Sequence, residues 1–152
     1  MLVKNLLDSK PRQIVSVKPE TSVDEAMDLL IRNNIGCLPV VDNAGELIGI
    51  VSDKDIFKRI HEMKGQYHDL NVKDLMSTNL IVGLPDDDIM YIAGMMKKNW
   101  IRHVPIVVEG TVVGLVSLRD ILKTVTRTTD IENRYLKMYM DGLHSRDRSA
   151  DY

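Results

Sequence analysis

Two short segments of the sequence pair a serine with an aspartate three residues later. Ser52 and Asp55 follow residues 49–51, and Ser117 and Asp120 follow residues 114–116. A serine that opens a helix can accept a hydrogen bond from a free backbone N–H of the first turn, so this spacing is typical of a helix cap. The same groups suit a nucleotide, because helix N-terminal N–H groups and a hydroxyl can bind phosphate, and one carboxylate can accept hydrogen bonds from two neighbouring ribose hydroxyls. The two interpretations are compatible.

Both segments belong to a longer internal repeat. The repeated residues pair as Pro19 with Pro85, Pro39 with Pro105, Gly49 with Gly114, Ser52 with Ser117 and Asp55 with Asp120. The offset is 66 residues at the prolines and 65 from the glycine onward, so the copies differ there by one deletion. Upstream, residues 3–7 are echoed by residues 72–76. Two copies of one unit therefore fill most of the chain. Because polar positions repeat as well as apolar ones, the sequence predicts two related pockets.

Each copy is expected to contain a strand, a helix, two strands and a second helix. In the first copy these elements are a strand at 14–17, a helix from the cap Ser22 to about Asn33, a hairpin of 38–41 and 47–51, and a helix from Ser52. In the second copy they are a strand at 80–82, a helix after the acidic residues 86–88, a hairpin of 104–108 and 112–116, and a helix from Ser117. Apolar periodicity and turn residues carry these assignments.

The predicted fold is α+β, with two tandem β-α-β-β-α repeats packed with pseudo-twofold symmetry and an additional C-terminal helix. With 152 residues, each half alone is small for an independent core, so we expect the halves to share an apolar face. The expected parts are a first repeat with its N-terminal segment at 1–62, a connector at 63–71, a second repeat at 72–127, and a C-terminal helix and tail at 128–152. Ile131, Tyr135, Met138 and Tyr139 mark the additional helix, and we expect the polar tail 145–152 to fray.

Composition narrows the function classes. A net charge of -2 gives no general attraction for nucleic acid. The single cysteine, Cys37, cannot form an internal disulfide and is interpreted as a small buried apolar residue. The sequence contains neither a signal peptide nor an apolar run of about 18 residues, so we expect a cytoplasmic protein without a membrane segment. The four histidines lack metal-ligand spacing and no known nucleophile or phosphate-loop motif occurs, so we expect neither a metal site nor catalytic residues.

Residues 37–41 and 102–107 precede the two Ser-x-x-Asp segments at matching spacing. With these additions the sequence resembles proteins with a tandem pair of cystathionine-beta-synthase (CBS) domains, also called Bateman modules, from about Val3 to Val125. The resemblance implies a disk of sheets and helices with two clefts, each drawing on both repeats. It also implies regulatory binding of an adenosine-containing ligand such as AMP, ADP, ATP, NAD or S-adenosylmethionine, with no catalytic cofactor.

Carried over by motif, the resemblance implies two sets of site residues. The favoured cleft would place adenine near Val15, Val17, Ile35 and Gly36, ribose on Asp120, and phosphate near Ser117, Arg119, Arg102 or His103. The second cleft would use Val82, Leu84, Ile101 and Arg102 for the base and Ser52 and Asp55 for ribose and phosphate, with Lys54 nearby. The first set is favoured because Gly36 and Cys37 stand where the second repeat has Arg102 and His103, so cations gather in one cleft.

Three functions remain open at the level of sequence. The leading hypothesis is a non-catalytic sensor, a homodimer whose ligand occupancy is detected by a partner protein of unknown identity. The alternative is a ligand-free structural module that assembles through its C-terminal helix. A nucleic-acid binder is the third possibility and would use Lys97, Lys98, Arg102, Arg119, Lys123 and Arg127. The small aromatic fraction of 5% leaves few stacking platforms for single strands.

Overall fold

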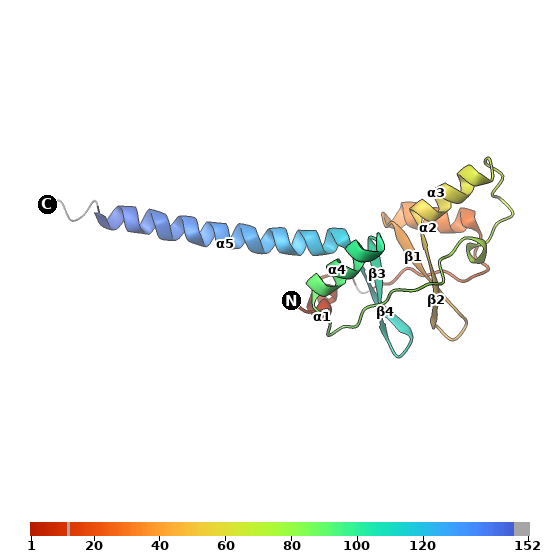
Figure 1. The fold of residues 1–152 in the computed structure, drawn as a ribbon, viewed down its shortest axis with the longest axis horizontal. Helices are drawn as coiled ribbons and strands as arrows, with labels where there is room; N and C mark the ends of the chain where they lie inside the picture. Colours follow the sequence, from red (N-terminus) through yellow and green to blue (C-terminus); the bar gives the residue numbers. More distant parts are fainter. Residues whose placement is uncertain (12, 148–152) are drawn as a thin grey trace.

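The computed structural model describes residues 1–11 and 13–147, with side chains as far as Met138. Two similar units of hairpin and helices lie next to each other, and one long helix projects from them (Figure 1). In chain order the elements are α1 (Val3–Asp8), α2 (Val23–Asn33), β1 (Cys37–Val41), β2 (Leu47–Ser52), α3 (Asp53–Glu62), the 3-10 helix η1 (Val72–Asp74), α4 (Ile89–Asn99), β3 (His103–Val108), β4 (Thr111–Ser117) and α5 (Leu118–Asp147). The α+β class and the two predicted hairpins are confirmed.

The two hairpins have matching registers. β1 pairs antiparallel with β2, and β3 pairs antiparallel with β4. Val40 lies opposite Gly49, and Ile106 lies opposite Gly114, with an irregularity directly after each pair. The sequence repeat is therefore also a repeat of backbone geometry.

The predicted opening strands at 14–17 and 80–82 are wrong as strands. Val17 forms only an isolated parallel bridge, in which its N–H donates to Pro39 O at 3.0 Å and its carbonyl accepts from Val41 N at 2.9 Å. Gly83 forms the matching bridge in the second repeat, with Pro105 and Val107 as its hydrogen-bond partners. A parallel ladder would next need an N–H from Pro39 or Pro105, which proline lacks. The repeated prolines therefore limit this pairing to a single residue.

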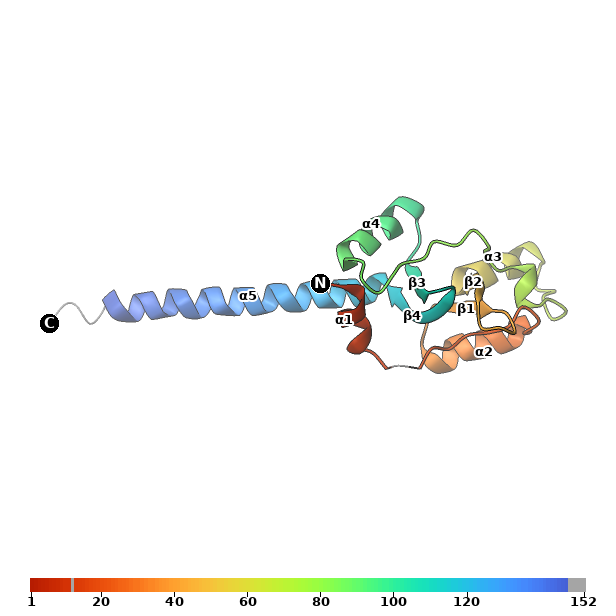
Figure 2. The ribbon, with the colours of Figure 1, turned by 90° about the horizontal axis from the view of Figure 1, so that it is seen from below.

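The predicted C-terminal helix is confirmed, but it is continuous with the last helix of the second repeat. Residues Leu118–Asp147 form one continuous helix of 30 residues, which includes 145–147 of the expected tail. The sequence has no proline in this range, and its first glycine is Gly142, so nothing breaks the helix between the repeat and the extension. Figures 1 and 2 both show α5 leading away from the two-repeat body. The rest of the expected tail, 148–152, lies outside the described residues.

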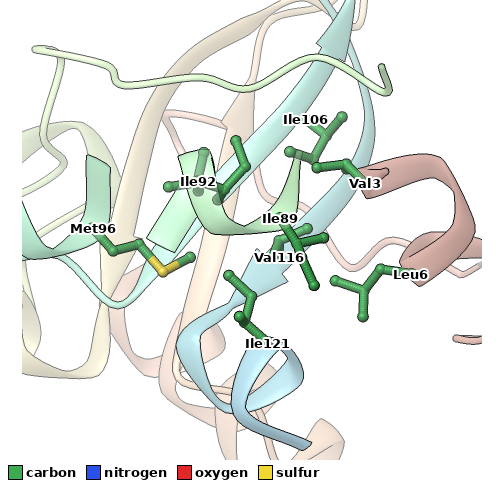
Figure 3. Close-up of a cluster of buried hydrophobic side chains, with 9 residues drawn as sticks. Val3, Leu6, Ile89, Ile92, Met96, Ile106, Val116 and Ile121 are labelled. Atoms are coloured by element: carbon green, nitrogen blue, oxygen red, sulfur yellow. The ribbon is translucent and has the colours of Figure 1, made fainter. Parts of the chain in front are cut away.

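Each repeat has its own apolar core, and each core is completed by a segment that precedes the other repeat. In the second repeat's core, Val3 and Leu6 of α1 pack with residues of α4, β3, β4 and α5 (Figure 3). In the first repeat's core, Val72 of η1 packs with residues of α2, β1, β2 and α3.

Backbone hydrogen bonds repeat this exchange. Val3 N donates to Asp87 O at 2.9 Å, and Val72 N donates to Thr21 O at 2.8 Å. The echo between residues 3–7 and 72–76 therefore reflects two equivalent packing segments. Because the exchange interlocks the repeats, neither core is complete without chain from the other half.

In the part of the chain that the structure covers, no helix has both the length and the apolarity to cross a membrane.

Candidate functional site

The two repeated aspartates both cap the helix that follows them. Asp55 Oδ2 accepts from Ser52 N at 3.0 Å while Ser52 Oγ accepts from Asp55 N at 3.2 Å. In the second repeat, Asp120 Oδ2 accepts from Ser117 N at 2.9 Å and Ser117 Oγ accepts from Asp120 N at 3.1 Å. Among the described residues, no donor contacts the other carboxylate oxygen, Oδ1, of either aspartate. Each carboxylate therefore caps its helix through one oxygen and keeps the second for another partner.

Lys10 distinguishes the two aspartates. Its Nζ donates to Asp120 Oδ2 at 2.6 Å and to Leu115 O at 2.9 Å. The Lys10 side chain is 33% exposed and that of Asp120 is 22% exposed. Burial opposes ionisation of Asp120, but the hydrogen bonds from Lys10 and Ser117 N and the charge of Lys10 outweigh it, so the pKa of Asp120 is lowered. Asp120 is therefore a carboxylate at neutral pH.

A cavity of about 770 Å³ lies between the two repeats, beside this ion pair. Val15 and Ile35 line it from the first repeat, and Leu115 of β4 lines it from the second. Lys10 lines the same cavity, so its ammonium group joins the cavity wall to Asp120. The volume lies in the range of small-molecule pockets. Of the residues predicted for the base, Val15 and Ile35 therefore face a real cavity.

Val17 is placed differently. It is 4% exposed and belongs to the apolar core of the first repeat, where its backbone bonds to β1. Its side chain therefore belongs to the core and does not line the cavity.

Gly36, Arg102 and His103 lie together at the junction of the repeats. A Cβ atom built on Gly36 would lie 3.1 Å from His103 Cε1 and 3.4 Å from Asp53 Oδ2, so a larger residue at position 36 would crowd this junction. Arg102 Nη2 lies 3.3 Å from Asp53 Oδ1, which forms an ion pair between the second repeat and the first. Arg102 itself is 62% exposed. The structure therefore brings three of the predicted residues together and adds Asp53, which the motif analysis did not select.

Two side chains at this junction, His103 and Cys37, have pKa values shifted toward the neutral form. Burial lowers the pKa of His103 below its ordinary value of 6.5, and the charge of Arg102 adds to this effect, although Asp53 and Asp120 oppose it. His103 is therefore neutral near pH 7. Burial, followed by the charges of Asp55 and Asp53, raises the pKa of Cys37 to about 12, so this thiol stays protonated.

The remaining predicted residues lie apart from the cavity. Arg119 lies with Leu122 and Lys123 along a separate shallow groove on α5. In the second set, Val82, Leu84 and Lys54 are exposed, whereas Ile101 packs against the core of the second repeat. Ser52 and Asp55 are half-buried at the start of α3.

Lys10 was missed by the motif analysis because it lies in no repeated motif. The match between residues 3–7 and 72–76 contains a signal that could have identified Lys10. Val3 pairs with Val72 at an offset of 69 residues, and the same offset places Asn79 opposite Lys10. The two copies therefore differ in charge at this position, with Lys10 in one and Asn79 in the other. Lys10 lies next to α1, the segment that packs on the second repeat.

Comparison with known proteins agrees with this geometry. A family model described as CBS domain matches residues 4–62 and 72–127. The CBS domain-containing protein YhcV of Bacillus subtilis is 32% identical over 119 residues, which cover 78% of this chain and 84% of YhcV. Several other relatives are longer proteins, of which the chain spans only 22 to 39%.

Two solved structures are similar and hold ligands. The CBS domain pair of protein MJ0100, in complex with 5'-methylthioadenosine and S-adenosyl-L-methionine, has a TM-score of 0.74 and 32% identity, with 84% of this chain and 98% of that one covered. CBSX2 in complex with AMP has a TM-score of 0.69 and 26% identity, with 84% and 98% covered.

Proposed function

The chain belongs to the CBS domain family, and from this premise we propose that it binds an adenosine-containing ligand between its two repeats and signals occupancy to a partner protein. The observation that carries the proposal is the cavity of about 770 Å³ that draws on both repeats and is lined by Lys10, whose ammonium group pairs with the ionised Asp120. The ligands of MJ0100 and CBSX2 all contain adenosine, which supports this class of ligand. AMP, ADP, ATP and NAD are the candidates, and the role is regulatory and non-catalytic.

In the proposed complex, each part of the ligand meets a different group. The base packs against the apolar side chains of Val15 and Ile35. The ribose hydroxyls donate to Asp120 Oδ1, the oxygen that the helix cap leaves available. Ser117 keeps its hydroxyl proton for a phosphate oxygen, because its Oγ only accepts in the cap. Arg102 pairs with Asp53 at the junction of the repeats. In the complex its guanidinium would leave Asp53 and bind the phosphate instead.

The second cleft is proposed as the weaker site. Its carboxylate, Asp55, has the same cap geometry as Asp120, with Ser52 as partner. Lys54, Val82, Leu84, Ile101 and Arg102 are the other residues proposed for it. No lysine among the described residues pairs with Asp55, so this cleft has less positive charge for a phosphate.

Signalling follows from a ligand that touches both repeats. Such a ligand shifts an equilibrium between two arrangements only by the difference in its affinity for them. Because α5 begins directly after Ser117, a change at the Asp120 cleft acts on the base of the projecting helix.

We also propose that the protein is a homodimer and that α5 contributes to the interface. Apolar side chains remain exposed on its projecting part, including Tyr135 at 71% and Leu136 at 62%. A helix in water is only marginally stable unless its apolar face packs against another surface, which a second copy of α5 would supply. We expect Leu136→Glu to lower the dimer fraction in sedimentation equilibrium, whereas Lys137→Gln should not. A monomeric wild type would contradict this arrangement.

A cytoplasmic location stays a prediction from the sequence.

A ligand panel on the wild-type protein tests the main proposal. AMP, ADP, ATP, NAD, S-adenosylmethionine and 5'-methylthioadenosine would be added in turn and thermal unfolding recorded. A ligand at 100 times its dissociation constant should stabilise the fold by about 2.7 kcal/mol, which corresponds to a rise in Tm of about 5 to 11 °C. No shift with any of the six would support the structural module instead, and salt-sensitive binding of an oligonucleotide would support the nucleic-acid binder.

A further inference from the structure

We propose that Lys10 makes the Asp120 cleft selective for adenosine ligands that carry a 5'-phosphate over those that carry an uncharged 5' group. This inference rests on the proposed function, since it concerns the same cleft. It concerns a residue from the segment before the first repeat, outside both repeated motifs.

Lys10 has the contacts that such a role requires. Its ammonium group has three N–H donors. Two of them are used by Asp120 Oδ2 and Leu115 O, and among the described residues no partner takes the third. Because Lys10 also lines the cavity, an anion inside the cavity can accept this donor without breaking the ion pair.

The position of Lys10 matches the expected position of a phosphate. A ribose held by Asp120 carries its 5' group on the same five-membered ring as the hydroxyls that donate to the carboxylate. A cation bonded directly to that carboxylate is therefore within reach of the 5' group, since the lysine stem is long and flexible. Lys10 also offsets the charge of Asp120, which would otherwise repel a phosphate.

Other cations near the cleft are less suited to this role. The guanidinium of Arg102 is paired with Asp53 and exposed to solvent, where salt and water weaken its attraction for an anion. His103 is neutral near pH 7 for the reasons given above. Lys4 lines the same cavity, but its Nζ lies 2.7 Å from Asp86. Lys10 is more shielded, with a side chain that is 33% exposed.

The equivalent place in the first repeat shows that this arrangement is not a requirement of the fold. Leu115 O, which accepts from Lys10, corresponds to Ile50 O in the first repeat. Ile50 O instead accepts from the backbone N–H of Ser77 at 2.8 Å, and the residue corresponding to Lys10 is the uncharged Asn79. The fold is therefore satisfied by an ordinary backbone hydrogen bond at this place. A half-buried lysine that replaces it in only one cleft indicates a role toward a ligand.

The test compares AMP with 5'-methylthioadenosine, which lacks the phosphate, by calorimetric titration of the full chain. In Lys10→Gln the amide can still donate to Leu115 O, but the charge is gone. We expect Lys10→Gln to weaken AMP binding by about tenfold or more, and to change binding of 5'-methylthioadenosine by less than about twofold. Lys10→Arg should keep most of the preference for AMP. Lys4→Gln, which removes another lysine from the same cavity, should leave both affinities within about twofold.

Three outcomes would overturn the inference while the proposed function stands. They are equal weakening of both ligands in Lys10→Gln, unchanged AMP binding, or tighter AMP binding, which would identify Lys10 as a plug that a ligand must displace. A wild type that binds neither ligand would instead reject the proposed function, and the inference with it. The Lys10→Arg variant guards against misreading a folding defect, because it keeps the ion pair with Asp120.

Discussion

At the scale of single residues, Asp55 and Asp120 perform the same local task in different surroundings. Both accept their own cap N–H through Oδ2, at 3.0 and 2.9 Å. The Ser-x-x-Asp spacing predicts this cap, because it depends only on residues within one helical turn. The lysine that bonds to Asp120 could not be predicted in the same way, since Lys10 lies 110 residues away and reaches its partner only after α1 has packed on the second repeat.

His103 gives a pH prediction at this scale. Its pKa is lowered in the folded protein, so between that value and 6.5 the unfolded chain binds more protons than the folded one. His103 should therefore contribute a loss of stability as the pH falls below about 6.5. We expect the urea midpoint of the wild type to decrease as the pH is lowered from about 7.5 to about 5.5. The midpoint of His103→Gln should decrease less over the same interval. Identical slopes for the two proteins would show that His103 does not titrate in this range.

At the scale of elements, the exchanged packing segments explain why residues upstream of each repeat resemble each other. α1 and η1 each complete the core of the repeat that they do not precede. The echo in the sequence indicates equivalent segments but not which core each one joins, because that depends on the path of the connecting chain. The single-residue bridges at Val17 and Gly83 also could not be predicted from local β propensity. Propensity does not take account of the N–H groups that Pro39 and Pro105 lack in the neighbouring strand.

Gly114 tests the packing of α1 on β4. A Cβ atom at this position would lie 2.6 Å from both Cδ1 and Cδ2 of Leu7, so the side chain or the helix must move. We expect Gly114→Ala to lower the free energy of unfolding by about 1 to 3 kcal/mol in urea denaturation. Gly94→Ala is the control, since nothing lies within 4 Å of its Cβ position, and a helical alanine should be neutral or stabilising by up to about 1 kcal/mol. Equal stability of the wild type and Gly114→Ala would mean that α1 packs loosely.

At the scale of the whole molecule, duplication accounts for most of what could be predicted. Repeated polar and apolar residues indicate the α+β class and the two hairpins, and the structure and the CBS domain match agree with them. The pair of related clefts stays a prediction. The continuity of α5 was not predicted, because the repeat ends at about Arg127 while helix-forming residues continue beyond it. The cavity could be predicted only in part. Its apolar wall follows from Val15 and Ile35, whereas its charge comes from Lys10 in the exchanged segment.

The most direct measurement is calorimetric titration of AMP into two variants of the full chain, Asp120→Ala and Asp55→Ala. Both substitutions remove the same cap hydrogen bond, so the loss at the helix start is matched between them, and only Asp120→Ala also releases Lys10 from its ion pair. If Asp120 holds the ribose, Asp120→Ala should weaken AMP binding by about tenfold or more, and Asp55→Ala should lose much less. A larger loss in Asp55→Ala, or unchanged binding in Asp120→Ala, would contradict the placement of the ligand in this cleft.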